Sequence, residues 1–282
     1  MKILFILCEG SHDAQFLFRL LQASETYEDP KWKISEYPDP LPQFFKQNFQ
    51  HQDLESIVIG EPTPLMVPAV ALKRKDTDEL VLIYKMGGES NVQYTLNLLE
   101  KLRVFLPSES DELRYYPGQG GTNEYAILFF YDADEQGRQN VLDTFIQRYS
   151  DHFEGLNGFS METWEVKRGI PLGLFVFTGE GRETGTLEDT LIHLVSQKDE
   201  SLVKSATRFI DDHSDHQQET VTQQAKRAKS ILTSSGQTRK KQAGASLAVI
   251  VRHSAFLDDA FDFADSSNQW SRILKMIQTA FL

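Results

Sequence analysis

Short apolar runs separated by helix-like segments constrain the fold of this chain most strongly. The clearest runs are residues 3–8, 80–84, 126–131 and 173–177. Each is shorter than a typical helix and apolar at consecutive positions, which is the pattern of a strand buried on both faces of a sheet. Segments with apolar residues at helical spacing follow several of these runs. Strands that alternate with helices predict an α/β fold, with a mainly parallel sheet and helices on both faces.

Three further stretches complete the predicted organisation. Prolines make residues 28–66 irregular. Apolar runs on either side of the polar turn at 76–79 predict a β-hairpin. From residue 198 onward the pattern is mostly helical, apart from the apolar run at 247–251. We therefore expect an α/β domain over residues 1–180 with an insertion at about 28–78, and a helical extension over 181–282 that packs on the same domain.

The composition excludes several classes of protein. A net charge of −12 over 282 residues argues against a general polyanion binder, although a local basic surface remains compatible with it. The single cysteine, Cys8, leaves no disulfide framework and no cysteine zinc site, and it favours a reducing, cytoplasmic setting. No segment approaches the roughly 18 apolar residues of a membrane helix. Residues 1–10 are expected to form a first strand and not a signal peptide.

Acidic residues follow two of the predicted strands. Glu9 ends the first strand, and Asp132 and Asp134 end a later one. Ligands of parallel sheets bind at the carboxyl ends of the strands, so these acids lie where chemistry is expected. On a strand, the spacing of the two aspartates places both side chains on one face, about 6.6 Å apart. Such clustered anions favour a hard divalent cation with oxygen ligands, and magnesium fits best. The alternative is a simple turn whose aspartates cap the next helix.

These motifs together resemble the Toprim domain. The resemblance rests on Glu9-Gly10 after the first strand, on Asp132-Ala-Asp134-Glu-Gln-Gly137 after a later one, and on a strand–glycine–helix unit between them. Toprim domains occur in topoisomerases, bacterial primases, recombination-mediator proteins and overcoming-lysogenization-defect nucleases. The resemblance covers roughly residues 1–180 and implies a Toprim-like, Rossmann-type sheet. It also implies that Glu9 is the general acid/base of phosphodiester chemistry and a metal ligand, and that Asp132 and Asp134 bind Mg²⁺, or Mn²⁺ in its place.

The nuclease branch of that family carries a further acid and a lysine after the two aspartates. Here the resemblance implies Glu188 as the additional metal ligand and either Lys240 or Lys241 as the catalytic lysine. Glu188 has a second interpretation, because an acid in the first turn of a helix is favoured by the helix dipole. The other branches fit less well: the chain has little room for a topoisomerase gate, it lacks a cysteine zinc module, and no Walker-type motif is present.

A basic tract interrupts the acidic chain. Residues 221–252 contain no Asp or Glu. The residues expected to bind nucleic-acid phosphates are Lys226, Lys229, Arg239, Lys240 and Lys241. The alternative is a solvated helix face followed by a basic loop.

Three functions remain open from the sequence. The first is magnesium-dependent chemistry on the phosphodiesters of DNA or RNA, most simply that of a nuclease. The second is a non-enzymatic Toprim-like module that binds nucleic acid or a protein. The third is a phosphohydrolase that acts on nucleotides or other small phosphates. The sequence leaves the oligomeric state open.

Overall fold

The computed structural model describes residues 1–47, 67–87, 92–102, 105, 123–167, 169–213, 221–240, 246–253 and 257–282, with the backbone alone at 221–223 and 238–240. The strands are β1 Lys2–Cys8, β2 Tyr27–Glu28, β3 Val70–Arg74, β4 Glu79–Lys85, β5 Glu124–Asp132, β6 Trp164–Lys167 and β7 Ile170–Phe177. The helices are α1 Ser11–Ala23, η1 Ile34–Glu36, α2 Leu41–Lys46, α3 Val92–Leu102, α4 Gly137–Tyr149, α5 Leu187–Lys198, α6 Glu200–His213, α7 Val221–Lys240, α8 Leu247–Arg252, η6 Asp258–Ala260 and α10 Gln269–Gln278.

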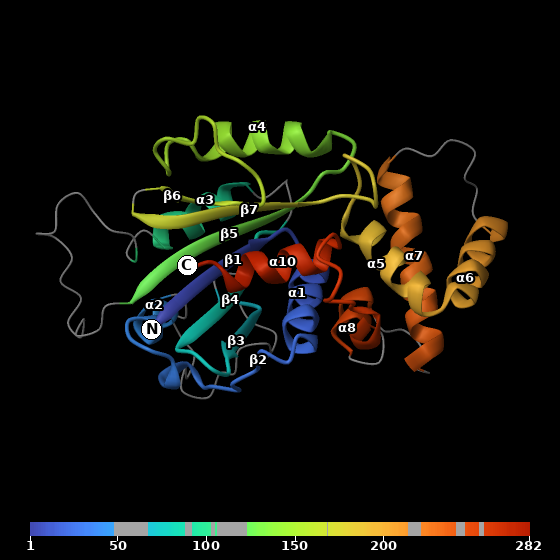
Figure 1. Cartoon of the computed structure of the whole chain (residues 1–282), viewed down its shortest axis with the longest axis horizontal. Helices are drawn as coiled ribbons and strands as arrows, with labels where there is room; N and C mark the ends of the chain where they lie inside the picture. Colours follow the sequence, from blue (N-terminus) through green and yellow to red (C-terminus); the bar gives the residue numbers. More distant parts are fainter. Residues whose placement is uncertain are drawn as a thin grey trace, which may run out of the picture.

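The strands form one seven-stranded sheet in the order β2-β3-β4-β1-β5-β7-β6 (Figure 1). The four central strands, β4, β1, β5 and β7, are parallel. Their carboxyl ends therefore meet at one edge of the sheet, where α5, α6 and α7 gather (right side of Figure 1). The predicted α/β fold with a mainly parallel sheet and a helical C-terminal region is confirmed.

Helices cover both faces of the sheet, and β1 is therefore buried on both sides. Ile3, Phe5 and Leu7 belong to a core shared with α2, α3 and α4. The intervening residues of β1 point into the opposite core, which is shared with α1, α5, α8 and α10. Alternation with a period of two produces these two cores from one continuous apolar run. The C-terminal helices thus complete the second core and do not form a separate unit.

The predicted hairpin is present, since β3 and β4 pair antiparallel. β4 is a central strand, so the hairpin is part of the main sheet. The irregular stretch at 28–66 contains two helices among its described residues, η1 and α2, which the prolines concealed. Strand β6 was not predicted, because it lies at the sheet edge and Val166 is 70% exposed.

The apolar run at 247–251 is helical and was wrongly set apart from the helical region. Leu247, Ile250 and Val251 are buried, whereas Val249 is half exposed. Burial at the first, fourth and fifth positions is the spacing of a helix face, and the run is too short for its sequence alone to show this. Among the described helices, none is both long and apolar enough to span a membrane.

Candidate functional site

Strands β1 and β5 bring Glu9 and Asp132 together at the carboxyl edge of the sheet. The two strands are parallel neighbours, with Cys8 opposite Phe130. Glu9 follows the end of β1, and its Oε1 accepts a hydrogen bond from the backbone N–H of Asp132 at 3.1 Å. The convergence of these two residues, which the sequence predicted from strand ends alone, is therefore present.

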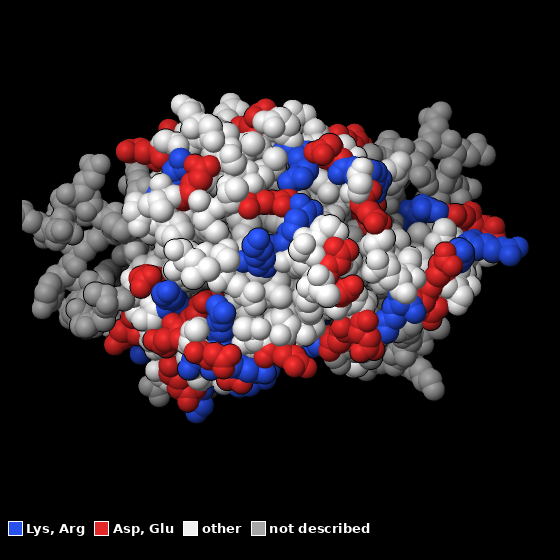
Figure 2. All heavy atoms as spheres, in the orientation of Figure 1, with Lys and Arg blue, Asp and Glu red and all other residues white. Residues whose placement is uncertain are grey.

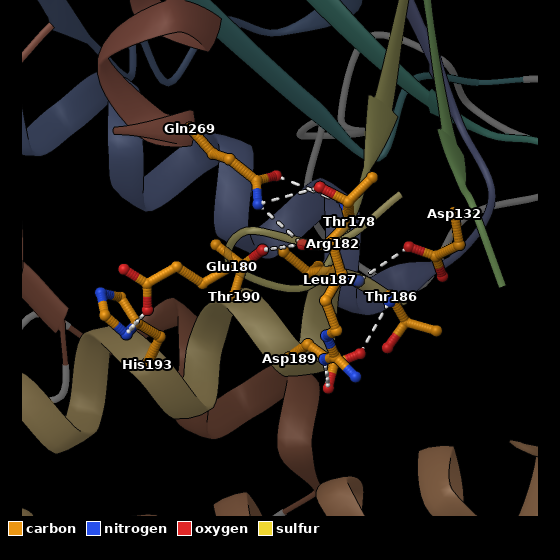
Figure 3. Close-up of polar contacts among 10 residues, drawn as sticks. All are labelled: Asp132, Thr178, Glu180, Arg182, Thr186, Leu187, Asp189, Thr190, His193 and Gln269. Carbon is orange, nitrogen blue, oxygen red and sulfur yellow. Dashed lines mark hydrogen bonds and ion pairs between the residues drawn. The ribbon is translucent and has the colours of Figure 1, made fainter. Parts of the chain in front are cut away.

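The carboxylate of Asp132 lies at the first residue of α5. Its Oδ1 accepts a hydrogen bond from the backbone N–H of Leu187 at 2.8 Å (Figure 3). Burial raises the pKa of Asp132 well above its usual value, and neighbouring acids add to the rise. These acids are Asp13, Glu9 and Glu188. One helix N–H does not outweigh this loss of solvation and this repulsion, so the pKa of Asp132 remains raised.

Asp13 is part of this group of acids, although the sequence did not assign it to a site. Its Oδ2 accepts a hydrogen bond from the backbone N–H of Gly10 at 2.5 Å, as expected for an acid in the first turn of a helix. Its side chain is buried, and burial raises its pKa to about 6. We call Glu9, Asp13, Asp132 and Glu188 the carboxylate site.

Glu188 has two positive partners in the carboxylate site. Its Oε1 lies 3.1 Å from Nδ1 of His12 and 3.5 Å from Nζ of Lys229. Burial opposes ionisation, but the hydrogen bond from His12 and the charge of Lys229 prevail and lower the pKa of Glu188. Glu188 is also in the first turn of α5, as the helix-dipole interpretation required. Its assignment as a metal ligand stays a prediction.

Asp134 does not continue the strand, so the prediction that strand geometry aligns it with Asp132 is wrong. β5 ends at Asp132, and Asp134 has a left-handed backbone with φ 47°. Its backbone pairs with that of Gly185 in an isolated bridge. Asp132 is therefore the last residue of the strand, whereas Asp134 lies beyond it with a left-handed backbone. Asp134 lines a cavity of about 550 Å³ together with Arg182, Asp189 and residues of α7.

The backbone conformation at Gly137 explains why the D-x-D-x-x-G motif ends in a glycine. Gly137 begins α4 with φ +80°, a region that residues with a Cβ rarely adopt. Its N–H bonds to the carbonyl of Ala133 and closes the turn between β5 and α4. Asp132 and Asp134 flank the buried Ala133 at the start of this turn.

Helices α7 and α8 carry the described part of the basic tract, and two of its arginines contact other parts of the protein. Arg227 forms two hydrogen bonds with Asp211, at 2.7 and 2.8 Å. Arg252, which follows in α8, lies over the ring of Phe18. Lys226 is exposed, as expected for a phosphate-binding residue.

Lys229 is the lysine that the structure brings to the carboxylate site. The side chains of Arg239 and Lys240, and the whole of Lys241, lie outside the described residues, so their predicted roles stay predictions. On the face in Figure 2, the Lys and Arg side chains that the structure describes are interspersed with acids and form no broad basic patch.

The donor atoms of the carboxylate site are all hard oxygens. Among the described residues, no group of three or more His, Cys, Asp or Glu is arranged to hold a metal ion as it stands. Three of the acids accept a hydrogen bond from a backbone N–H: Glu9 from Asp132, Asp13 from Gly10 and Asp132 from Leu187. Glu9 and Asp132 thus bring two carboxylates together from neighbouring strand ends.

Comparison with known proteins shows the fold alone. No protein-family model matches this chain, and a search of curated proteins finds no match. The crystal structure of a hypothetical protein from Pyrococcus horikoshii OT3 superposes with a TM-score of 0.52 and 14% sequence identity, over 99% of this chain and 95% of that one.

Proposed function

We propose that this protein is a magnesium-dependent enzyme that hydrolyses phosphodiester bonds of nucleic acid. The observation that carries the proposal is the convergence of Glu9 and Asp132 from adjacent parallel strands, with Asp13 and Glu188 beside them. Four acids gather at the carboxyl edge of a parallel sheet, and their mutual repulsion together with burial raises the pKa of Asp132. A ligand that supplies positive charge at this edge would relieve that repulsion.

Glu9 and Asp132 are the residues that would hold the metal. Magnesium is usually bound by one or two carboxylates, with waters and substrate phosphates completing its shell, so a pair of acids from adjacent strands is a sufficient protein contribution. Asp134 and Glu188 remain further candidates on the resemblance to Toprim domains. When bound, the ion would stabilise the charge that develops on the phosphate and lower the pKa of a coordinated water.

The surrounding residues have roles that follow from their contacts. Lys229 pairs with Glu188 and would contribute positive charge to a bound phosphate. Glu9 would act on the proton of the attacking or leaving oxygen, as the family resemblance implies. Lys226, one helical turn before Lys229, would contact the backbone of the substrate outside the site.

One observation favours a second candidate, the hydrolysis of a small phosphate. Arg227 and Arg252 are engaged within the fold, which reduces the basic surface available to a long polyanion. The cavity beside Asp134, about 550 Å³, has the volume of a small-ligand site. Nucleotides or other phosphate monoesters and diesters would then be the substrates.

The test is a cleavage assay with single- and double-stranded DNA and RNA and with nucleotides, in Mg²⁺, in Mn²⁺ and in a chelator. Metal-dependent cleavage of a polynucleotide that Glu9→Gln and Asp132→Asn abolish would support the first candidate. Asp143→Asn is the matched control, because Asp143 is exposed on α4. Turnover of nucleotides alone would support the second candidate, and binding without any turnover would favour a non-enzymatic module.

A further inference from the structure

A second cavity lies on the other side of the loop that joins β7 to α5. Its volume is about 530 Å³, and its wall includes residues 178–183, the start of α10 and side chains of α4 and α5. Like the carboxylate site, it lies beyond the carboxyl end of a parallel strand, because Thr178 directly follows β7. The amide of Gln269 fixes this wall by bonding to the carbonyl of Thr178 at 2.7 Å (Figure 3).

Three arginines line this cavity: Arg138, Arg182 and Arg272. Two of them share a single acid, because Arg138 and Arg272 bind different oxygens of Glu162 at 2.5 and 2.6 Å. One carboxylate between two guanidinium groups leaves a positive charge in excess. The Nε–H groups of Arg138 and Arg272 are buried without a hydrogen-bond partner among the described residues. Buried donors in this state are rare in proteins. Because these two atoms have almost no exposed surface, a ligand in the cavity would bond to the terminal N–H groups of the arginines.

The other acids near the cavity are placed differently from Glu162. Glu180 pairs with Nδ1 of His193 at 2.5 Å, and Asp189 pairs with Arg182 at 2.8 Å (Figure 3). Glu183 also lines the cavity and is exposed to solvent. The first turn of α10 contributes no acid. The pair of guanidinium groups on Glu162 thus remains the part of the wall in which cations outnumber their partners.

We propose that this arginine cavity binds a phosphate monoester. Guanidinium groups present several N–H donors in a planar fork that matches phosphate oxygens, and their bonds to phosphate are strengthened by charge. The volume accommodates a mononucleotide, and the same chemistry accepts the terminal phosphate of a polynucleotide strand. The site needs no metal, so it is independent of the proposed enzymatic function.

The experiment is calorimetric titration of the full chain in a chelator, which keeps the carboxylate site free of metal. The probes are inorganic phosphate, adenosine monophosphate, and one oligonucleotide with and without a terminal phosphate. The variants are Arg138→Gln and Arg272→Gln. Arg208→Gln is the control, because Arg208 is on α6 with its side chain 86% exposed. Loss of one charged contact is expected to weaken phosphate binding at least about tenfold, and the control should match the parent.

The source of the phosphate follows from the probes. Tighter binding of adenosine monophosphate than of the phosphorylated oligonucleotide supports the site and assigns it to free nucleotides. A preference for the phosphorylated over the unphosphorylated oligonucleotide supports it and assigns it to strand ends. Absence of phosphate binding by the parent, or equal binding by the parent and both folded variants, would overturn the proposal.

Two milder substitutions cover the case in which the glutamine variants fail to fold. Arg138→Lys keeps the charge beside Glu162 but loses the fork, and Arg182→Gln changes a side chain that is half exposed. Binding that neither substitution weakens would also overturn the proposal.

Discussion

The carboxylate site and the arginine cavity lie at the same edge of the sheet, on either side of the loop between β7 and α5. They differ in the sign of the side chains that gather in them. In the carboxylate site, burial and neighbouring acids raise the pKa of Asp132. In the arginine cavity, two guanidinium groups share Glu162. Each arrangement is costly alone, because charges removed from water must be matched locally.

The comparison teaches that the two proposals call for ligands of opposite charge. A cation would complete the first, and an anion would complete the second. A substrate that carries phosphate together with a divalent metal has both. Several measurements can test this comparison, beginning with the one for which the largest effect is expected.

Asp132→Asn and Glu9→Gln should each lower metal-dependent hydrolysis on the order of a thousandfold, about 4 kcal/mol in activation free energy. Both substitutions remove a carboxylate donor and keep the volume of the side chain. Measurement of kcat/KM in saturating Mg²⁺ checks this. Phosphate binding to the arginine cavity in a chelator should be unchanged in both variants. If it falls as well, the two regions are one site and the comparison breaks.

Asp13→Asn should change the pH dependence of stability. Burial raises the pKa of Asp13 from 3.8 to about 6, so between these values the folded state holds a proton that the unfolded chain has released. The free energy of unfolding therefore falls as pH rises through this window. The full difference corresponds to about 3 kcal/mol, which Asp13→Asn should recover at neutral pH.

Urea unfolding of the parent and the variant across the acidic range, without metal, measures this difference. Asp143→Asn is the control with an exposed acid, and its curve should run parallel to that of the parent. If the curve of Asp13→Asn also runs parallel to that of the parent, burial does not raise the pKa of Asp13.

Lys229→Ala should lower hydrolysis about tenfold, because Lys229 contacts the carboxylate site through Glu188. Lys226→Ala is the matched comparison, one turn earlier on α7. It should leave kcat unchanged and only weaken binding, with the slope of log affinity against log salt reduced by about one unit. Equal effects of the two substitutions on kcat would mean that α7 acts as a general basic surface.

Gly137→Ala should cost about 1–2 kcal/mol of stability, because φ +80° is unfavourable for a residue with a Cβ. Gly158→Ala provides a matched control, since Gly158 has the same φ and lies away from the site with no atom near its Cβ position. Thermal unfolding should show similar losses for both. Only Gly137→Ala should also lower hydrolysis, since it is in the turn that carries Asp132.

The sequence predicted the sheet well and the site in part, for reasons that particular residues make clear. The continuous apolar run of β1 predicts a buried strand. Because the carboxyl ends of parallel strands lie at one edge of the sheet, the sequence also predicts that Glu9 and Asp132 lie there. A D-x-D motif does not predict that the backbone of Asp134 is left-handed. The approach of Lys229 and His12 to Glu188 depends on how α7 and α1 pack, which local patterns do not encode.

The arginine cavity could not be predicted from the sequence for the same reason. Arg138, Glu162 and Arg272 are widely separated along the chain, and no local periodicity links them. Tertiary packing of α4 and α10 at the sheet edge creates their cluster. Sequence patterns report which face of an element is buried, but they do not report which distant charges meet.

Arg182 lines both cavities, and this shared position has a thermodynamic consequence. A ligand that draws Arg182 toward one side changes the free energy of occupying the other. Linkage then requires reciprocity: the factor by which phosphate in the arginine cavity alters the affinity of the cavity beside Asp134 for its ligand equals the factor by which that ligand alters the affinity for phosphate. Titration of each ligand in the presence of the other measures both factors, and Arg182→Gln should bring them to one.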